Sequence, residues 1–174
     1  MSRARTLALA MAFTGLFAGP ALAAGSGVAV FPFGFQDTSI EGEVRGSDPA
    51  EAARLRMITQ ETRERLRQRG VALFDLSALE EDVAGLPDPW DCLDCAARLA
   101  GTAGAEVSIT GFVHKVSTLI QSISIIAYDA RTGEMLGNAS VSIRGNTDEA
   151  WKRGVDYILD RGLLGKDVET ALYP

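Results

Sequence analysis

Apolar residues follow two different spacings along this chain, and the spacing changes near residue 105. Before that point, short apolar runs alternate with segments in which apolar residues recur every three to four positions, which is typical of helices. After it, three segments rich in β-branched residues follow one another closely, at 106–116, 118–129 and 135–144. The pattern predicts strands alternating with helices first, and three successive strands afterwards.

The first predicted strand covers residues 27–35 and is apolar on both faces, which suits a strand covered on both sides. Pro32 has no N–H for a sheet hydrogen bond, so we expect a bulge, an edge or the strand's exit there. Residues 36–46 are polar and acidic and are predicted to form a loop. A short buried strand is predicted at 71–75.

The first predicted helix begins with clear signals: Asp48 as N-cap, Pro49 at the first helical position and Glu51 at the third. Gly70 ends it. Its predicted buried stripe consists of Ala52, Leu55, Ile58 or Thr59, Thr62 and Leu66. The opposite face is rich in arginine and glutamate, and we expect it to be solvated, with mixed charge pairs.

Shorter helical segments are predicted further along. Residues 76–83 form one or two turns, and a second helix covers about 92–99 with Asp91 as its N-cap. The segment 129–134 is predicted to be a hairpin turn in which Gly133 can adopt the left-handed conformation.

The last predicted helix is capped by Asn146 together with Glu149 and ends at Gly162. Its apolar side contains Trp151, Val155 and Ile158. The tail at 163–174 is expected to pack back through Leu164, Val168 and Tyr173.

The predicted order is therefore β-α-β-α-β-β-β-α. Strand–helix–strand units require parallel pairing through right-handed crossovers, whereas tight turns join antiparallel neighbours. The sequence predicts an α/β (α+β) fold with one mixed β-sheet of about five strands flanked by three main helices. Residues 24–174 are predicted to be a single α/β domain with a short C-terminal tail.

Residues 1–23 have the pattern of a cleaved signal peptide: a basic start, an apolar run at 7–18 and the small-x-small sequence Ala21-Leu22-Ala23. A retained membrane anchor is disfavoured because the apolar run is interrupted and shorter than the roughly 20 residues a span requires. No cysteine lies near the cleavage point, so we expect no lipid anchor. The mature protein is expected to be soluble, exported and periplasmic.

The chain carries 17 basic and 23 acidic residues, and removal of Arg3 and Arg5 with the signal peptide lowers the net charge from −6 to −8. Nucleic acids and anionic membranes are poor partners for such a surface, because phosphate binding requires positive charge. The charge therefore favours neither a nucleic-acid-binding protein nor a membrane-surface protein.

Several segments, taken in order, resemble the TolB amino-terminal type of domain, which the curli secretion protein CsgG and the LpoB activator of penicillin-binding proteins share. They are VAVFPF at 28–33, the amphipathic helix after it, AARLA at 96–100 leading through Gly104 and Ala105 into SITGFV at 108–113, and DARTGE at 129–134. The chain most resembles an uncharacterised family of small exported bacterial proteins with a domain of unknown function. The resemblance covers residues 27–162. It implies a TolB amino-terminal-like fold and a non-catalytic docking or assembly role in the cell envelope.

Cys92 and Cys95 are the only cysteines and stand three residues apart. In an oxidising compartment they can form a local disulfide, act as a redox pair or hold a metal. We favour the disulfide, with a thiol–disulfide redox protein as the main alternative. A thioredoxin-type site is disfavoured, because its pair follows a strand directly and about seventeen residues separate Phe74 from Cys92.

A metal-binding carrier is the third possibility. Acidic residues crowd the segment 80–94 without a basic residue among them: Glu80, Glu81, Asp82, Asp88, Asp91 and Asp94. Their spacing matches no EF-hand loop, so we interpret them as a solvated acidic rim. His114, the sole histidine, is predicted to be a surface or hydrogen-bonded residue rather than a zinc ligand. No cofactor is predicted.

No nucleophile elbow or phosphate-binding loop is present, so we expect a binding protein and not an enzyme. The expected partner is another envelope or exported protein. The candidate contact residues lie on one face of the hairpin and in the cysteine loop: Ser122, Ser124, Asn138, Ser140, Ser142, Trp90, Asp91 and Asp94. A free strand edge in that hairpin would offer backbone groups to a partner strand.

Overall fold

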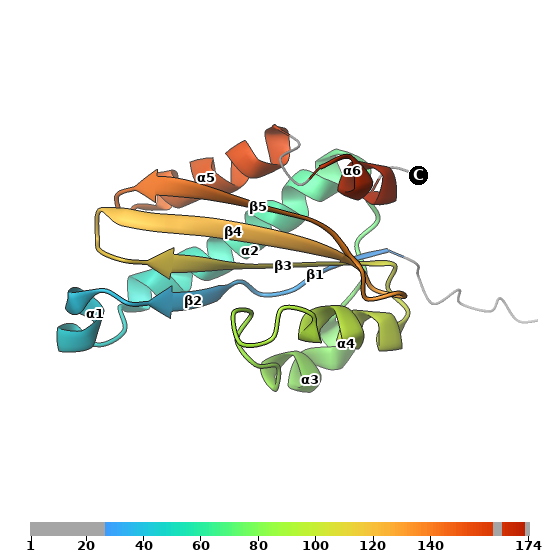
Figure 1. The fold of residues 1–174 in the computed structure, drawn as a ribbon, viewed down its shortest axis with the longest axis horizontal. Helices are drawn as coiled ribbons and strands as arrows, with labels where there is room; N and C mark the ends of the chain where they lie inside the picture. Colours follow the sequence, from blue (N-terminus) through green and yellow to red (C-terminus); the bar gives the residue numbers. More distant parts are fainter. Residues whose placement is uncertain (1–26, 162–164, 173–174) are drawn as a thin grey trace, which may run out of the picture.

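The computed structural model describes residues 27–161 and 165–172. They form one mixed sheet with helices on both faces (Figure 1). The signal peptide predicted at 1–23 and the helix end predicted at Gly162 lie outside the described residues, as do Leu164 and Tyr173 of the tail.

The first predicted strand is two strands separated by a proline. β1 (Val28–Val30) and β2 (Gly34–Asp37) both pair in parallel with the same neighbour, β3. Pro32 lies between them, as its missing N–H predicts. Residues 27–35 are therefore not one continuous strand.

The predicted antiparallel strands are confirmed as β3 (Val107–Lys115), β4 (Ile120–Asp129) and β5 (Met135–Arg144). The sheet order is β1–β3–β4–β5, with β2 also paired to β3, which gives the five-stranded mixed sheet expected from the sequence. In the turn between β4 and β5, Gly133 has a φ of 75°, the left-handed conformation predicted for it.

Residues 36–46 are not the loop that their polarity predicts. β2 extends to Asp37, and helix α1 (Ile40–Arg45) follows it closely. Ser39 is the N-cap, and its Oγ accepts a hydrogen bond from the Gly42 N–H at 3.0 Å. The loop prediction was wrong because it weighed composition and overlooked this cap.

Helix α2 (Pro49–Gln68) begins as predicted, with the Asp48 carboxylate accepting a backbone N–H of the first turn. Most of the predicted stripe is buried: Ile58, Thr59, Thr62 and Leu66. Ala52, however, is exposed, and the neighbouring Glu51 is buried instead. The reason is that the Glu51 carboxylate pairs with Lys115, 2.7 Å away.

The segment after α2 is less regular than predicted. Residues 71–75 contribute only an isolated parallel bridge between Leu73 and Val28, in place of a strand. The predicted one or two helical turns are confirmed as the 3-10 helix η1 (Ser77–Leu79) and helix α3 (Glu80–Ala84).

Helix α4 (Cys95–Ala103) begins three residues later than predicted, with Asp94 in place of Asp91 at the N-cap position. Cys92 lies in the irregular segment before the helix, where its N–H donates to the Asp88 carbonyl oxygen at 3.2 Å. Near its C-terminal end, α4 approaches the β4–β5 turn very closely. A Cβ atom on Gly101 would lie 1.9 Å from the carbonyl oxygen of Ala130.

Helix α5 (Asp148–Asp160) is capped by Thr147, not by Asn146. The Thr147 Oγ1 accepts the Ala150 N–H at 3.2 Å, whereas Asn146 donates its side-chain amide to Glu51. Burial of the predicted apolar side is confirmed for Trp151, Val155 and Ile158. Helix α6 (Lys166–Leu172) follows, and the burial of Val168 agrees with the predicted packing of the tail.

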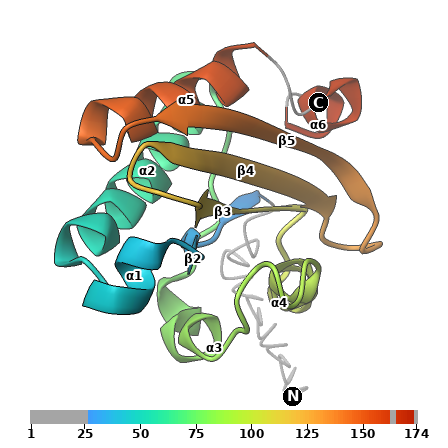
Figure 2. The same ribbon diagram turned by 60° about the vertical axis from the view of Figure 1, so that its left-hand side comes forward.

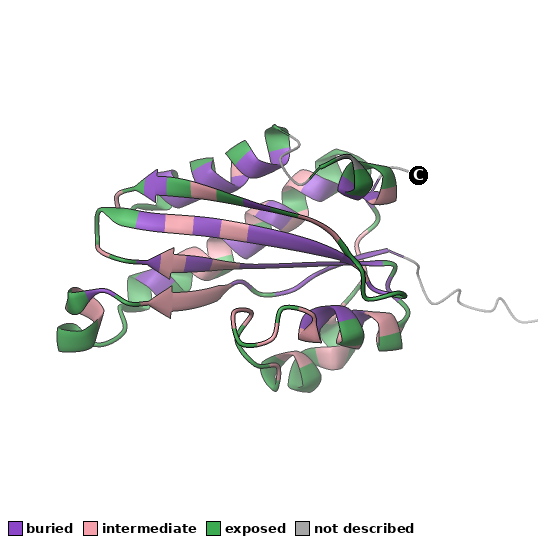
Figure 3. Cartoon of the chain, in the orientation of Figure 1, coloured by how far each residue is buried: buried purple, intermediate pink, exposed green. Residues whose placement is uncertain are grey.

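Helices cover the two faces of the sheet unequally. On one face, α2, α5 and α6 enclose the larger core, which includes Trp151 at its centre together with Ile58, Ile123 and Ile125. On the opposite face, α4 packs over Ile126 and the start of β1, and leaves the rest of β4 and β5 without a helix (Figures 1 and 2). On β4, buried positions alternate with exposed or half-buried ones from 120 to 125, and residues 126–128 are buried as well; on β5, exposed positions alternate with buried or half-buried ones from 138 to 144 (Figure 3).

Candidate functional site

The uncovered part of the sheet carries the polar hairpin residues that the sequence singled out. The strand register places His114, Ser122 and Ser142 in one row across the sheet, and Phe112, Ser124 and Ser140 in the next. Asn138, opposite Ile126, stands at the end of a third row. We call these seven residues the open face. The five hairpin residues predicted to share one face do so.

The open face is polar and built from short side chains. The Ser124 and Ser140 hydroxyls are hydrogen-bonded across the strands at 3.1 Å. Asn138, Ser140 and Ser142 on β5 are exposed, whereas Ser122 and Ser124 on β4 are half-buried. Each hydroxyl can both donate and accept a hydrogen bond. Such a surface can bind a partner without the entropic cost of ordering long side chains.

His114 closes one end of the open face. Its Nε2 lies 2.9 Å from the Thr38 Oγ1, so the ring is hydrogen-bonded and half-buried, as the sequence predicts. The contact joins β3 to the residue that follows β2.

The open face continues into the cysteine loop through two aromatic rings. Trp90, in the loop before α4, packs edge-on against Phe112 with the ring centroids 6.0 Å apart. Both side chains are half-buried. The two candidate surfaces that the sequence indicated separately, one on the hairpin and one around Trp90, therefore form a single surface.

The structure places the two sulfur atoms of Cys92 and Cys95 at 2.01 Å, the distance of a disulfide bond. The guanidinium of Arg98 lies beside them, with Nη2 2.9 Å from the Cys95 Sγ, and it also pairs with the Asp94 carboxylate. In a reduced pair, a guanidinium at this position favours the thiolate, and the nearby carboxylate opposes it. Sequence reasoning missed Arg98, which lies one helical turn after Cys95.

The acidic segment 80–94 does not come together as a cation site. Over residues 27–161 and 165–172, the one group of three potential metal ligands is Cys92, Asp94 and Cys95, whose ligand atoms lie within 4.8 Å of one another. Sulfurs that are bonded to each other cannot act as thiolate ligands. The arrangement therefore gives the metal-carrier hypothesis no oxygen cage of the kind that calcium requires.

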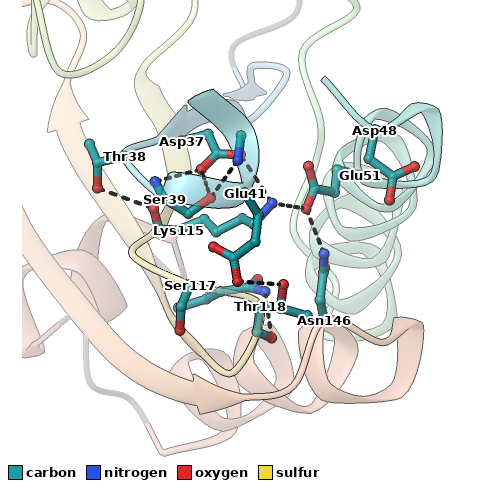
Figure 4. A network of polar contacts seen from close by, with 12 residues as sticks. Asp37, Thr38, Ser39, Glu41, Asp48, Glu51, Lys115, Ser117, Thr118 and Asn146 are labelled. Atoms are coloured by element: carbon teal, nitrogen blue, oxygen red, sulfur yellow. Dashed lines mark hydrogen bonds and ion pairs between the residues drawn. The ribbon is translucent and has the colours of Figure 1, made fainter. Parts of the chain in front are cut away.

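A buried polar network, unforeseen from the sequence, lies at the end of the sheet where α1 meets α2 (Figure 4). Lys115 Nζ lies 3.0 Å from Asp37 Oδ2 on β2 and 2.7 Å from Glu51 Oε1 on α2. Asn146 donates to the same Glu51 oxygen at 2.5 Å, and Ser39 donates to Asp37. One lysine thus holds two strands and a helix together.

Hydrogen bonding decides the charge states in this network. Burial acts to lower the pKa of Lys115, but hydrogen bonds to Glu51 and Asp37 outweigh it and hold the pKa above its usual value. Burial likewise acts to raise the pKa of Asp37, and hydrogen bonds from Ser39 and Lys115 hold it below its usual value. The Glu51 Oε2 is buried without a hydrogen-bond partner among the described residues. The network is a structural clamp.

None of the helices that the structure describes has the length and apolar character of a transmembrane span. No curated protein matches the chain.

Solved structures with a similar chain fold include lipoprotein GNA1162 from Neisseria meningitidis, at a TM-score of 0.50 and 18% identity, covering 79% of this chain and 96% of that one. The PelC dodecamer from Paraburkholderia phytofirmans gives a TM-score of 0.48 and 15% identity, over 85% of this chain and 94% of that one. The LpoB C-terminal domain from Salmonella enterica gives 0.37 and 13%, over 68% and 83%. At 18% identity, the likeness to GNA1162 concerns the fold alone.

The family model described as "Protein of unknown function (DUF2380)" matches residues 26–163, which include nearly all of the strands and helices described above. The chain therefore belongs to this family of proteins of unknown function.

Proposed function

We propose that this protein is an exported, non-catalytic docking protein that binds another envelope protein through the open face. The observation that carries the proposal is the continuity of this surface. The uncovered serine rows of β4 and β5 join the Trp90–Phe112 contact, so polar groups and two half-buried aromatic rings stand side by side. Tyrosine and tryptophan are enriched in protein interfaces, and hydrogen-bonding groups around an aromatic centre supply specificity.

The free edge of the sheet supports the same proposal. Within the described part of the chain, β5 pairs only with β4, so its outer backbone groups are available to a partner strand. A strand added there would lengthen each row of the open face by one residue. Export is inferred from the signal-like pattern at 1–23 and from the lipoprotein that shares the fold.

Site-specific crosslinking tests the proposal. A photo-reactive amino acid at position 140, in the middle of the open face, is expected to give an adduct with a distinct envelope protein in intact cells. The matched control is position 47, where the exposed Ser47 precedes α2, away from the hairpin.

A second measurement separates docking from chance proximity. With the photo-reactive residue kept at 140, the double variant Asn138→Arg/Ser142→Arg places two long charged side chains on exposed positions of β5 on either side of it, so it should abolish recovery of the crosslinked partner, while Ser47→Arg should leave it unchanged. Equal recovery with the two variants would rule out the open face as the docking surface.

A further inference from the structure

A cavity of ≈ 680 Å³ lies on the side of the molecule where α2 faces the segment 73–84. It opens where the parallel pairing of Val28 with Leu73 ends and the two chain segments diverge. Its apolar lining includes Val30, Pro32, Leu73, Phe74, Leu76 and Val83. The volume lies within the range of about 300–1,000 Å³ that is usual for small-molecule sites.

The topology of the sheet favours a ligand site at this place. From β1, the chain passes through α2 to the bridge at Leu73 on one side, and later through α4 to β3 on the other side. In open α/β sheets, ligands commonly bind beyond the carboxyl ends of the parallel strands. Val30 and Pro32 belong to the carboxyl end of β1 and line the cavity.

Charged residues divide the rim of the cavity into two sides. Arg63 and Arg67 project from α2 on one side, and Asp75 and Glu80 lie on the segment opposite. A ligand with one anionic group matches the arginine side. A second anionic group would face the carboxylates, so the rim selects against dianions.

Arg63 is the group that points to an anionic ligand. It is half-buried, and its Nη2 donates to the Val30 carbonyl oxygen at 2.7 Å. Among the ion pairs of the described residues, it has no carboxylate partner, whereas Arg54 and Arg65 on the same helix each have one. Burial, together with the neighbouring charge of Arg67, holds the pKa of Arg63 below its usual value. A half-buried cation without a counter-ion is costly, and a ligand anion would relieve that cost.

We propose that this cavity binds a small amphiphile with one carboxylate on an apolar body, such as a medium-chain fatty acid. Arg63 and Arg67 hold the carboxylate, and the apolar lining encloses the chain. None of the residues that line the cavity belongs to the open face, so this inference goes beyond the proposed docking function. Either proposal can be wrong without affecting the other.

Titration calorimetry of the purified protein with decanoate below its micelle concentration tests the proposal. We expect one decanoate per chain, with decylammonium and acetate giving no binding because one has the wrong charge and the other lacks the chain. Absence of decanoate binding, or equal binding of decylammonium, overturns the proposal. Tighter binding of a short peptide with a C-terminal leucine would overturn the assignment to a small amphiphile.

Two variants locate the site. Arg63→Gln is expected to weaken decanoate binding by about tenfold or more, because a charge-assisted hydrogen bond is lost. Arg56→Gln is the matched control, since Arg56 is an exposed arginine of the same helix outside the cavity. Ala84→Trp fills the cavity from an exposed lining position and should abolish binding even if Arg63→Gln does not fold. Unchanged affinity in the folded Ala84→Trp variant places the ligand elsewhere and overturns the proposal.

Discussion

The two faces of the sheet differ in what covers them, although the same strands form both. On the covered face, Ile123 and Ile125 of β4 point into a core closed by α2 and α5. On the open face, the alternate residues Ser122 and Ser124 of the same strand meet no helix. Strand alternation allows this division, because successive side chains point to opposite faces. The stabilising core contacts are therefore concentrated on one face, which leaves the other available for binding.

Removal of the central core side chain should give the largest effect. Trp151 is 0% exposed and stacks on Phe35 with ring centroids 5.9 Å apart. Its Nε1 has no hydrogen-bond partner among the described residues, so its contribution is packing. Trp151→Ala should lower the free energy of unfolding by about 3–5 kcal/mol, measured by urea denaturation. Phe112→Ala on the open face should cost about 1–2 kcal/mol. Equal losses would contradict the division between the faces.

Lys115 tests the polar end of the covered face. Lys115→Met leaves the buried carboxylates of Asp37 and Glu51 without their cation, and we expect a loss of about 3–5 kcal/mol at pH 7. Lys152→Met is the control, because Lys152 pairs with Glu61 at the surface and should cause a smaller loss.

The loss in Lys115→Met should depend on pH. The pKa of Asp37 is below its usual value in the folded protein, so its ion pair contributes stability above the unfolded pKa and loses it as the pH falls through the folded pKa. Protonation in acid also relieves the unpaired carboxylates of the variant. Urea denaturation from pH 7 down to pH 3 should therefore show a shrinking difference between the two proteins. A constant difference would mean that Lys115 acts through packing alone.

The cysteine pair should give the smallest effect on stability. A disulfide between Cys92 and Cys95 closes a very short loop and removes little entropy from the unfolded chain, so Cys92→Ala/Cys95→Ala should cost only about 1–2 kcal/mol. Thiol counting on denatured, unreduced protein from the periplasm should find no free thiol. Two free thiols per chain would refute the predicted disulfide and would strengthen the redox alternative.

Local patterns explain which parts of the structure were predictable. The strands from β3 to β5 are rich in β-branched residues and joined by short turns, and α2 carries its own cap at Asp48, so neighbouring residues alone specify them. The cap at Ser39 was also present in the sequence, but acidic composition concealed it. The helix start was misplaced because it was predicted from Asp91 as N-cap, whereas the helix begins after Asp94, whose side chain makes no capping hydrogen bond.

Contacts between distant residues explain most of what was missed. Lys115 and Glu51 are 64 positions apart, and nothing local indicates that a lysine in a strand and a glutamate in a capped helix will meet. The contact of Trp90 with Phe112 depends likewise on how the loop before α4 folds back on the sheet. The sequence predicted that the serines share one face. Their connection to the cysteine loop through Phe112 and Trp90 could be recognised only in the three-dimensional structure.

The close approach of α4 to the β4–β5 turn limits how chains of this fold can diverge. Because a side chain at position 101 would overlap the backbone of Ala130, any substitution of Gly101 must be accompanied by a shifted helix or a remodelled turn. Substitutions at 101 and length changes at 129–134 should therefore occur together. The residue at position 101 in a related chain should therefore indicate whether α4 keeps this close approach to the β4–β5 turn.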